Sequence, residues 1–87
     1  MNQEKRQALE LLKTARGQIE GIMKMIETER YCVDISNQIL AVSSILKKSN
    51  GLILRQHMNS CVRDAFLKGE GEEKVDEVMM LFDKVSR

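Results

Sequence analysis

The sequence predicts an all-α fold, and three observations support this prediction. Proline is absent from the 87 residues, and aromatic residues make up only 3%. The apolar residues are mostly Leu, Ile, Val and Met, a mixture that favours helices over strands. They recur at intervals of three and four residues, which is the period of an amphipathic helix. The length allows one small domain over residues 1–87.

An apolar stripe marks a first helix that fades at Thr28-Glu29-Arg30. Gly17 and Gly21 lie one turn apart within it and indicate close approach of another helix. The stripe consists of Leu9, Leu12, Ala15, Ile19, Ile22 and Ile26.

A second stripe begins at Ile35, continues past Gly51 and reaches Ala65. Asp34 or Ser36 is expected to cap its start. Ser49-Asn50-Gly51 resembles a helix C-cap, which would give two short helices in a hairpin. The apolar spacing nevertheless keeps its phase across Gly51, so we predict one helix of roughly 35 residues, about 50 Å long.

The run Lys68-Gly69-Glu70-Gly71-Glu72 predicts a break, because it combines two glycines with a charge cluster. A short third stripe follows, made of Val75, Val78, Met79, Phe82 and Val85. A long helix with one short partner on each side cannot cover its own apolar faces. The chain is therefore expected to form a homo-oligomer.

Charge and cysteine content restrict the function classes. The formal net charge is +1, so bulk charge does not indicate a nucleic-acid binder. With no long apolar run and no leader-like segment, we expect a cytoplasmic protein without a membrane partner. Two cysteines in that compartment indicate a metal site, a redox switch or core thiols. The single histidine has no catalytic partner pattern, which argues against an enzyme or a small-molecule substrate.

Cys32, His57 and Cys61 carry the chemistry. His57 and Cys61 are four residues apart, so on a helix their side chains share one face. Thiolate with imidazole suits Cu(I) or Zn(II); three ligands suit Cu(I), whereas Zn(II) needs a fourth. On a continuous helix Cys32 and His57 would be about 37 Å apart, so a shared ion would need two subunits. A hairpin at Gly51 would instead allow a site within one chain. The alternative to a metal site is that Cys32 and Cys61 are ordinary buried side chains unrelated to His57.

The sequence resembles the CsoR/RcnR/FrmR family of bacterial metal- and stress-sensing repressors. The resemblance covers nearly the whole chain. It rests on four segments: Arg16-Gly17-Gln18-Ile19-Glu20-Gly21-Ile22, Met25-Ile26-Glu27 leading to Tyr31-Cys32, Gln38-Ile39 with Ala41-Val42, and His57-Met58-Asn59-Ser60-Cys61-Val62.

The resemblance implies a three-helix protomer, an antiparallel dimer that forms a four-helix bundle, and a dimer of dimers. It implies a repressor that binds double-stranded operator DNA without metal and releases it when Cu(I) binds Cys32, His57 and Cys61. Tyr31 and Glu77 match the positions that surround the metal-bound histidine. The absence of a second histidine argues against nickel or cobalt. A persulfide or thiol-redox repressor that uses both cysteines is the alternative function. Zn(II) or no metal are the alternatives to Cu(I).

The family's helix-one motif places an acidic residue before the glycine and a basic residue after it. Here Arg16 comes first and Glu20 second, so the charges are exchanged. Leu11 also stands where many relatives have arginine. The expected DNA contacts are Lys13, Arg16, Gln18, Lys47 and Lys48.

Overall fold

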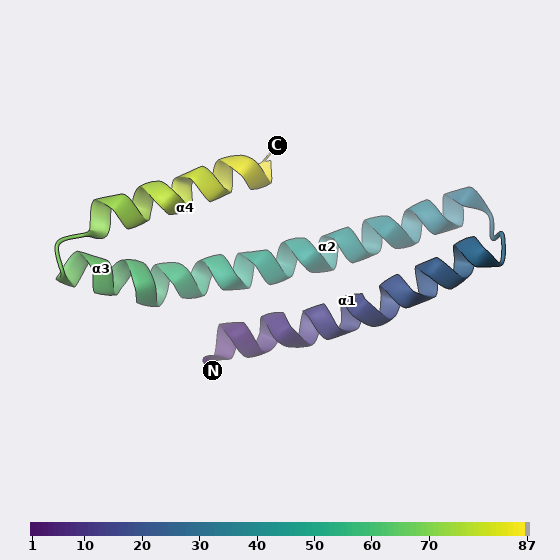
Figure 1. The fold of residues 1–87 in the computed structure, drawn as a ribbon, viewed down its shortest axis with the longest axis horizontal. Helices are drawn as coiled ribbons and strands as arrows, with labels where there is room; N and C mark the ends of the chain where they lie inside the picture. Colours follow the sequence, from purple (N-terminus) through teal and green to yellow (C-terminus); the bar gives the residue numbers. More distant parts are fainter. Residues whose placement is uncertain (87) are drawn as a thin grey trace. The chain divides into compact units, whose positions relative to one another are not determined.

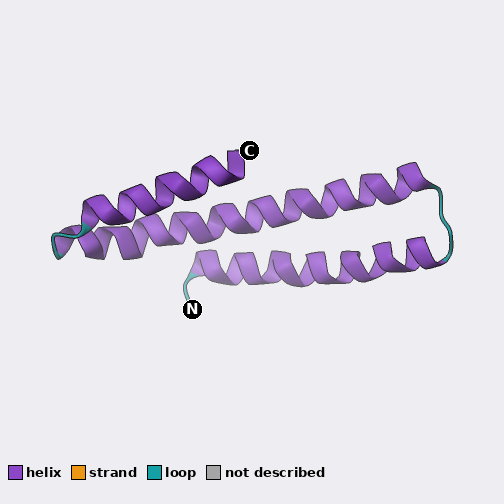
Figure 2. Ribbon diagram, turned by 45° about the horizontal axis from the view of Figure 1, so that its top comes forward, coloured by secondary structure: helices purple, strands orange, loops and turns teal. Residues whose placement is uncertain are grey.

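Every element in the described residues 1–86 of this computed structural model is helical (Figure 2). The order is α1 (Gln3–Glu27), α2 (Cys32–Gln56), η1 (His57–Val62), α3 (Arg63–Leu67) and α4 (Gly71–Ser86) (Figure 1). The chain divides into two compact units, Met1–Leu52 and Ile53–Arg87. The all-α prediction is confirmed. None of the helices described is long and apolar enough to span a bilayer.

The ends of α1 are set by local hydrogen bonds. The Asn2 side chain caps the start by accepting from the Lys5 amide at 2.8 Å. At the other end, the Arg30 amide donates to Met25 O at 2.9 Å and the Glu29 amide to Ile26 O at 3.1 Å. This is a Schellman motif, whose turning residue normally is glycine. Glu29 occupies it with a φ of +55°, in the left-handed region.

The core of the first unit is narrow and lies between α1 and α2, which run antiparallel side by side (Figures 1 and 2). Ala15 and Ile22 of α1 pack with Val42 of α2, and Ile35 and Ile45 lie against them. The predicted first stripe therefore divides between two faces. Ala15 and Ile22 are buried, whereas the stripe's larger side chains stay exposed at 40–57% of their surface: Leu9, Leu12, Ile19 and Ile26.

The second helix passes through Gly51 as predicted, which rules out the hairpin alternative. The backbone stays helical from Cys32 through η1 to the end of α3 at Leu67. The prediction of its start is wrong, because α2 begins at Cys32, upstream of both Asp34 and Ser36. Asp34 instead lies in the first turn, where the positive end of the helix dipole stabilises its carboxylate.

In the second unit, α4 packs against η1 and α3 after a tight turn at Lys68–Glu70. Gly69 takes the left-handed position of another Schellman motif, with a φ of +82°, and the Glu70 amide donates to Ala65 O at 2.6 Å. Position 71 is also glycine, because a β-carbon there would clash with the ring of Phe66. The glycine-rich break is thus confirmed. Around Gly17 and Gly21, by contrast, space for a β-carbon is open, so α2 makes no close approach at either glycine.

The two Schellman turns give a matched test of backbone strain. Replacing Glu29 by glycine relieves a left-handed residue and should raise the free energy of unfolding by about 0.5–1 kcal/mol, after the extra chain entropy of glycine is subtracted. Gly69→Ala should lower it by about 1 kcal/mol. Chemical denaturation measures both. Glu27→Gly, two residues earlier inside α1, is the control and should destabilise; stabilisation by Glu27→Gly as well would contradict the strain account.

Candidate metal centre and DNA-binding surface

His57 and Cys61 both lie on η1, a single π-helical segment. A π-helix closes its hydrogen bonds five residues on, so side chains four residues apart still point in neighbouring directions. The His57 side chain is half-buried and the Cys61 thiol is free and exposed. An imidazole and a thiol presented together form a soft donor pair. The structure thus brings together two of the three predicted ligands on one turn.

The position of η1 is set by α4, which packs against it. Val78 of α4 is 2% exposed and Ala65 of α3 is 5% exposed, so both are anchors of the second unit. Anything that displaces α4 will therefore disturb the turn that holds His57 and Cys61. Conversely, an ion held by that turn would be sensed by α4.

Cys32 and Tyr31 lie at the opposite end of α2. Cys32 is the first residue of the helix. Its thiol is free and exposed, and the Tyr31 side chain is 69% exposed. Both residues are available to a second chain.

Glu77, predicted to lie near the metal-bound histidine, is on α4 and forms an ion pair with Lys74 at 3.6 Å. The Lys74 and Glu77 side chains are 37% and 56% exposed, so solvent screens the pair and it contributes little to stability. Within residues 1–86, no three His, Cys, Asp or Glu side chains gather closely enough to hold a metal ion.

The predicted DNA contacts differ in their surroundings. Lys13 pairs with Glu10 at 3.5 Å, whereas Lys47 is exposed on α2. Arg16 is exposed but lines an apolar hollow. Gln18 is half-buried, and its side-chain carbonyl is buried without a hydrogen-bond donor in the described chain. Gln18 is therefore the least accessible of the five to a nucleic acid.

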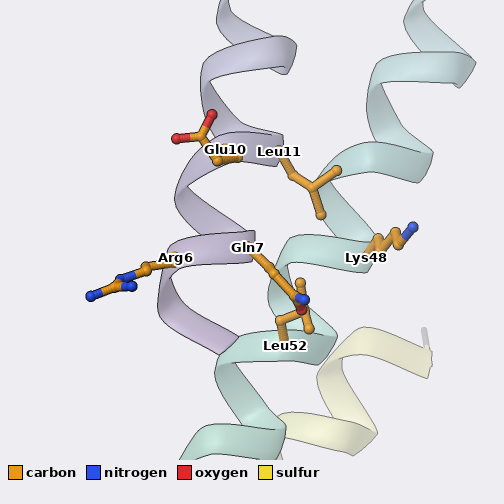
Figure 3. Close-up of a pocket in the computed structure, with 6 residues that line it drawn as sticks. All are labelled: Arg6, Gln7, Glu10, Leu11, Lys48 and Leu52. Carbon is orange, nitrogen blue, oxygen red and sulfur yellow. The ribbon is translucent and has the colours of Figure 1, made fainter. Parts of the chain in front are cut away.

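Lys48 lies at the edge of a groove between α1 and α2, about 440 Å³ in volume. Leu11 and Leu52 point into this groove, while Arg6 extends away from it on the outer side of α1 and Lys48 extends outward from α2 (Figure 3). Arg6 is not among the DNA contacts that the sequence predicts. Its position within the first two turns of α1, ahead of the apolar stripe, gives no signal that it borders this groove.

The π-helical turn is also not predicted by the sequence. Apolar spacing distinguishes α-helix from strand but not α-helix from a single wide turn. The one local signal is Asn59-Ser60, since both residues compete with the helical backbone for hydrogen bonds. Wide turns of this kind occur frequently at functional sites.

The chain is similar to known metal-sensitive repressors. A model of the metal-sensitive transcriptional repressor family matches residues 4–84. The chain is 42% identical over 79 residues to the copper-sensing transcriptional repressor CsoR of Mycobacterium ulcerans, covering 91% of this chain and 68% of that protein. It is 40% identical over 86 residues to the protein of that name from Bacillus subtilis, covering 99% and 85%.

A third relative, CsoR of Mycobacterium tuberculosis (strain H37Rv), is 43% identical over 75 residues; the match covers 86% of this chain and 63% of the relative's length. Among solved structures, the copper-sensing repressor CsoR with Cu(I) from Geobacillus thermodenitrificans has a TM-score of 0.88 at 33% identity. That match covers 100% of this chain and 91% of the other.

The helical fold and the family match over residues 4–84 together define a class of helical, metal-sensitive transcriptional regulators. The chain belongs to the metal-sensitive transcriptional repressor family. The resemblance seen in the sequence is thereby confirmed, as is the expectation of a transcriptional repressor rather than an enzyme.

The anchoring of η1 by α4 can be tested without metal. Val78→Ala removes two buried methyl groups and should lower the free energy of unfolding by about 2 kcal/mol. It should also speed amide hydrogen exchange over residues 57–62. Met80→Ala, on the exposed side of α4 at 64% exposure, is the control and should change stability by less than about 0.5 kcal/mol. Unchanged exchange over 57–62 in Val78→Ala would show that α4 does not hold the turn.

Proposed function

We propose that this chain is a copper-responsive transcriptional repressor that binds operator DNA without metal and releases it when Cu(I) binds. The observation that carries the proposal is the pairing of His57 and Cys61 on one π-helical turn, with a third soft donor, Cys32, exposed at the start of α2. The relatives described above are copper-sensing repressors, which supports it. The donor set fits Cu(I), which accepts three ligands of this kind.

A second copy of the chain is needed in this proposal, and the first unit offers a face for it. Several large apolar side chains share this face at helical spacing and remain 40–57% exposed. A small domain with this much exposed apolar surface is stabilised by association. We therefore propose a homo-oligomer built on an antiparallel dimer, with two such dimers in a tetramer. The side chains of the face are Leu9, Leu12, Ile19, Met23, Ile26, Ile39 and Leu46.

The metal would then lie between subunits. The helical backbone through Gly51 supports an arrangement in which Cys32 of one chain joins His57 and Cys61 of its partner. Cu(I) supplies a cation that draws two thiolates and a neutral imidazole together, and Zn(II) is the alternative ion if a fourth ligand joins. Tyr31 would reach the same region from beside Cys32, and Glu77 from α4 once it leaves Lys74. Such partners would orient the His57 ring and pass its position to α4.

Exposed cations on α1 and α2 are proposed to bind the DNA backbone. Lys47 and Lys48 are adjacent and free of ion pairs within residues 1–86, and Arg6 lies beside the same groove as Lys48. Symmetry multiplies each such residue by the number of subunits, so a chain of net charge +1 can neutralise many phosphates. Lys13 remains a further candidate.

The inducer is tested by anaerobic titration of the purified protein with Cu(I). One ion per chain should bind, and a coupling of about 3 kcal/mol would lower DNA affinity on the order of 150-fold. His57→Ala should weaken Cu(I) binding and abolish this release while leaving metal-free DNA binding intact. Met58→Ala, the adjacent exposed thioether, is the matched control and should behave as wild type. A His57→Ala protein that still releases DNA with Cu(I) would refute the proposed site.

The DNA surface is tested by the salt dependence of operator binding. Lys47→Ala and Lys48→Ala should each weaken binding to all sequences, and should reduce the slope of log affinity against log salt by about one for each phosphate that is no longer neutralised. Lys68→Ala changes a lysine that is also exposed, in the turn before α4; it is the control and should leave the slope unchanged. Equal slopes for the wild type and all three variants would show that DNA does not contact Lys47 or Lys48.

One observation favours a second candidate. Cys32 and Cys61 are both free and exposed, so a thiol oxidant or polysulfide can reach them. A thiol-redox or persulfide repressor would join the two cysteines across subunits and would not need His57. Oxidant-dependent crosslinking with DNA release in His57→Ala would select this candidate over copper.

A further inference from the structure

Arg16 lies in an unexpected place for a DNA contact. It lines a hollow of about 330 Å³ whose other lining residues are mostly apolar: Leu12, Ala15, Ile19, Glu20, Met23 and Leu46. Leu12, Ile19, Met23 and Leu46 belong to the face proposed to receive a second copy. Neither Arg16 nor Glu20 forms an ion pair within residues 1–86. Arginine four residues before glutamate is the less favourable order for pairing along a helix.

The packing of the hairpin fixes which residues of α1 and α2 are level with each other. Ala15 and Ile22 share the core with Val42 and Ile35, so residues pair in antiparallel order along the hairpin. Leu12 and Leu46 line the same hollow, one from each helix. Leu12 and Leu46 therefore mark one level of the first unit.

The proposed metal site fixes the level of the two-fold axis. If Cys32 of one chain meets His57 and Cys61 of the other, the axis crosses α2 midway between these positions, at about Leu46. It therefore crosses α1 at about Leu12. Across such an axis, α1 of one chain runs parallel to α2 of its partner.

We propose that Arg16 contacts Asn50 of the partner subunit and that this polar pair sets the register of the two chains. Arg16 follows Leu12 by four residues, and Asn50 follows Leu46 by four residues, so the parallel helices bring them to the same height. Both side chains are exposed in the single chain. The inference rests on the assembly in the proposed function, and it gives Arg16 a role in subunit pairing rather than in DNA binding.

The chemistry of the two stripes fits this contact. The facing stripe of α2 carries no charge within the first unit; it reads Ile39, Ser43, Leu46 and Asn50. Asn50 offers a carbonyl oxygen that can accept from the guanidinium, which can only donate. A single polar contact in an apolar seam fixes register, because any shift would bury a polar group against apolar side chains.

Charge exchange tests the contact, with association measured by sedimentation equilibrium without metal or DNA. Asn50→Lys sets a cation against Arg16 and should weaken association at least about tenfold, whereas Asn50→Asp should strengthen it. The double variant Arg16→Glu with Asn50→Lys should recover association to within about threefold of wild type. Ser44→Lys adds the same charge to α2 outside this stripe and should leave association unchanged.

Several results would overturn the contact: unchanged association of Asn50→Lys, or a double variant as weak as the single one. Loss of DNA binding by Arg16→Glu with its association intact would return Arg16 to the DNA surface. A wild-type chain that stays monomeric would remove the assembly on which both proposals rest. Failure of the wild type to bind Cu(I) would refute the proposed function while leaving the association measurements to decide the Arg16 contact.

Discussion

The structure depends on how little apolar surface the hairpin of α1 and α2 can bury. Within the first unit, the buried apolar side chains of these two helices are Ala8, Ala15, Ile22 and Val42. No large side chain in the described residues is fully buried. With burial contributing about 25 cal/mol per Å² of apolar surface, so small a core leaves the single chain marginal. Further stabilisation by apolar burial is thus possible mainly at the apolar side chains that the single chain leaves exposed.

This constraint links assembly to sensing. A regulator whose subunits are held together by the same helices that present its ligands can convert ligand binding into a change of subunit geometry. The thiol of Cys32 opens one helix, while His57 and Cys61 share the wide turn η1. Because α4 packs against η1, a change in that turn is transmitted to the end of the chain.

Much of this could be predicted from the sequence, and the failures have physical causes. The three helical segments follow from apolar spacing, and the continuous path through Gly51 follows from its phase. The capping prediction fails because residue type alone favours Asp34 and Ser36, whereas the helix starts at Cys32. The first stripe is one face by its spacing, yet Leu9, Leu12 and Ile19 lie beside the buried seam rather than in it. Apolar character cannot distinguish a residue that faces its own chain from one that faces a partner.

By itself the sequence determined the helical class, the break at Gly69 and Gly71, and the set of soft donors, because helix period, glycine chemistry and ligand type are local properties. The tertiary structure alone decided that Gln18 turns inward, that Arg16 borders an apolar hollow, and that His57 and Cys61 share a π-helical turn. These features depend on how closely one helix packs against another. This packing depends on side chains that are far apart in the sequence, so a local sequence pattern does not predict it.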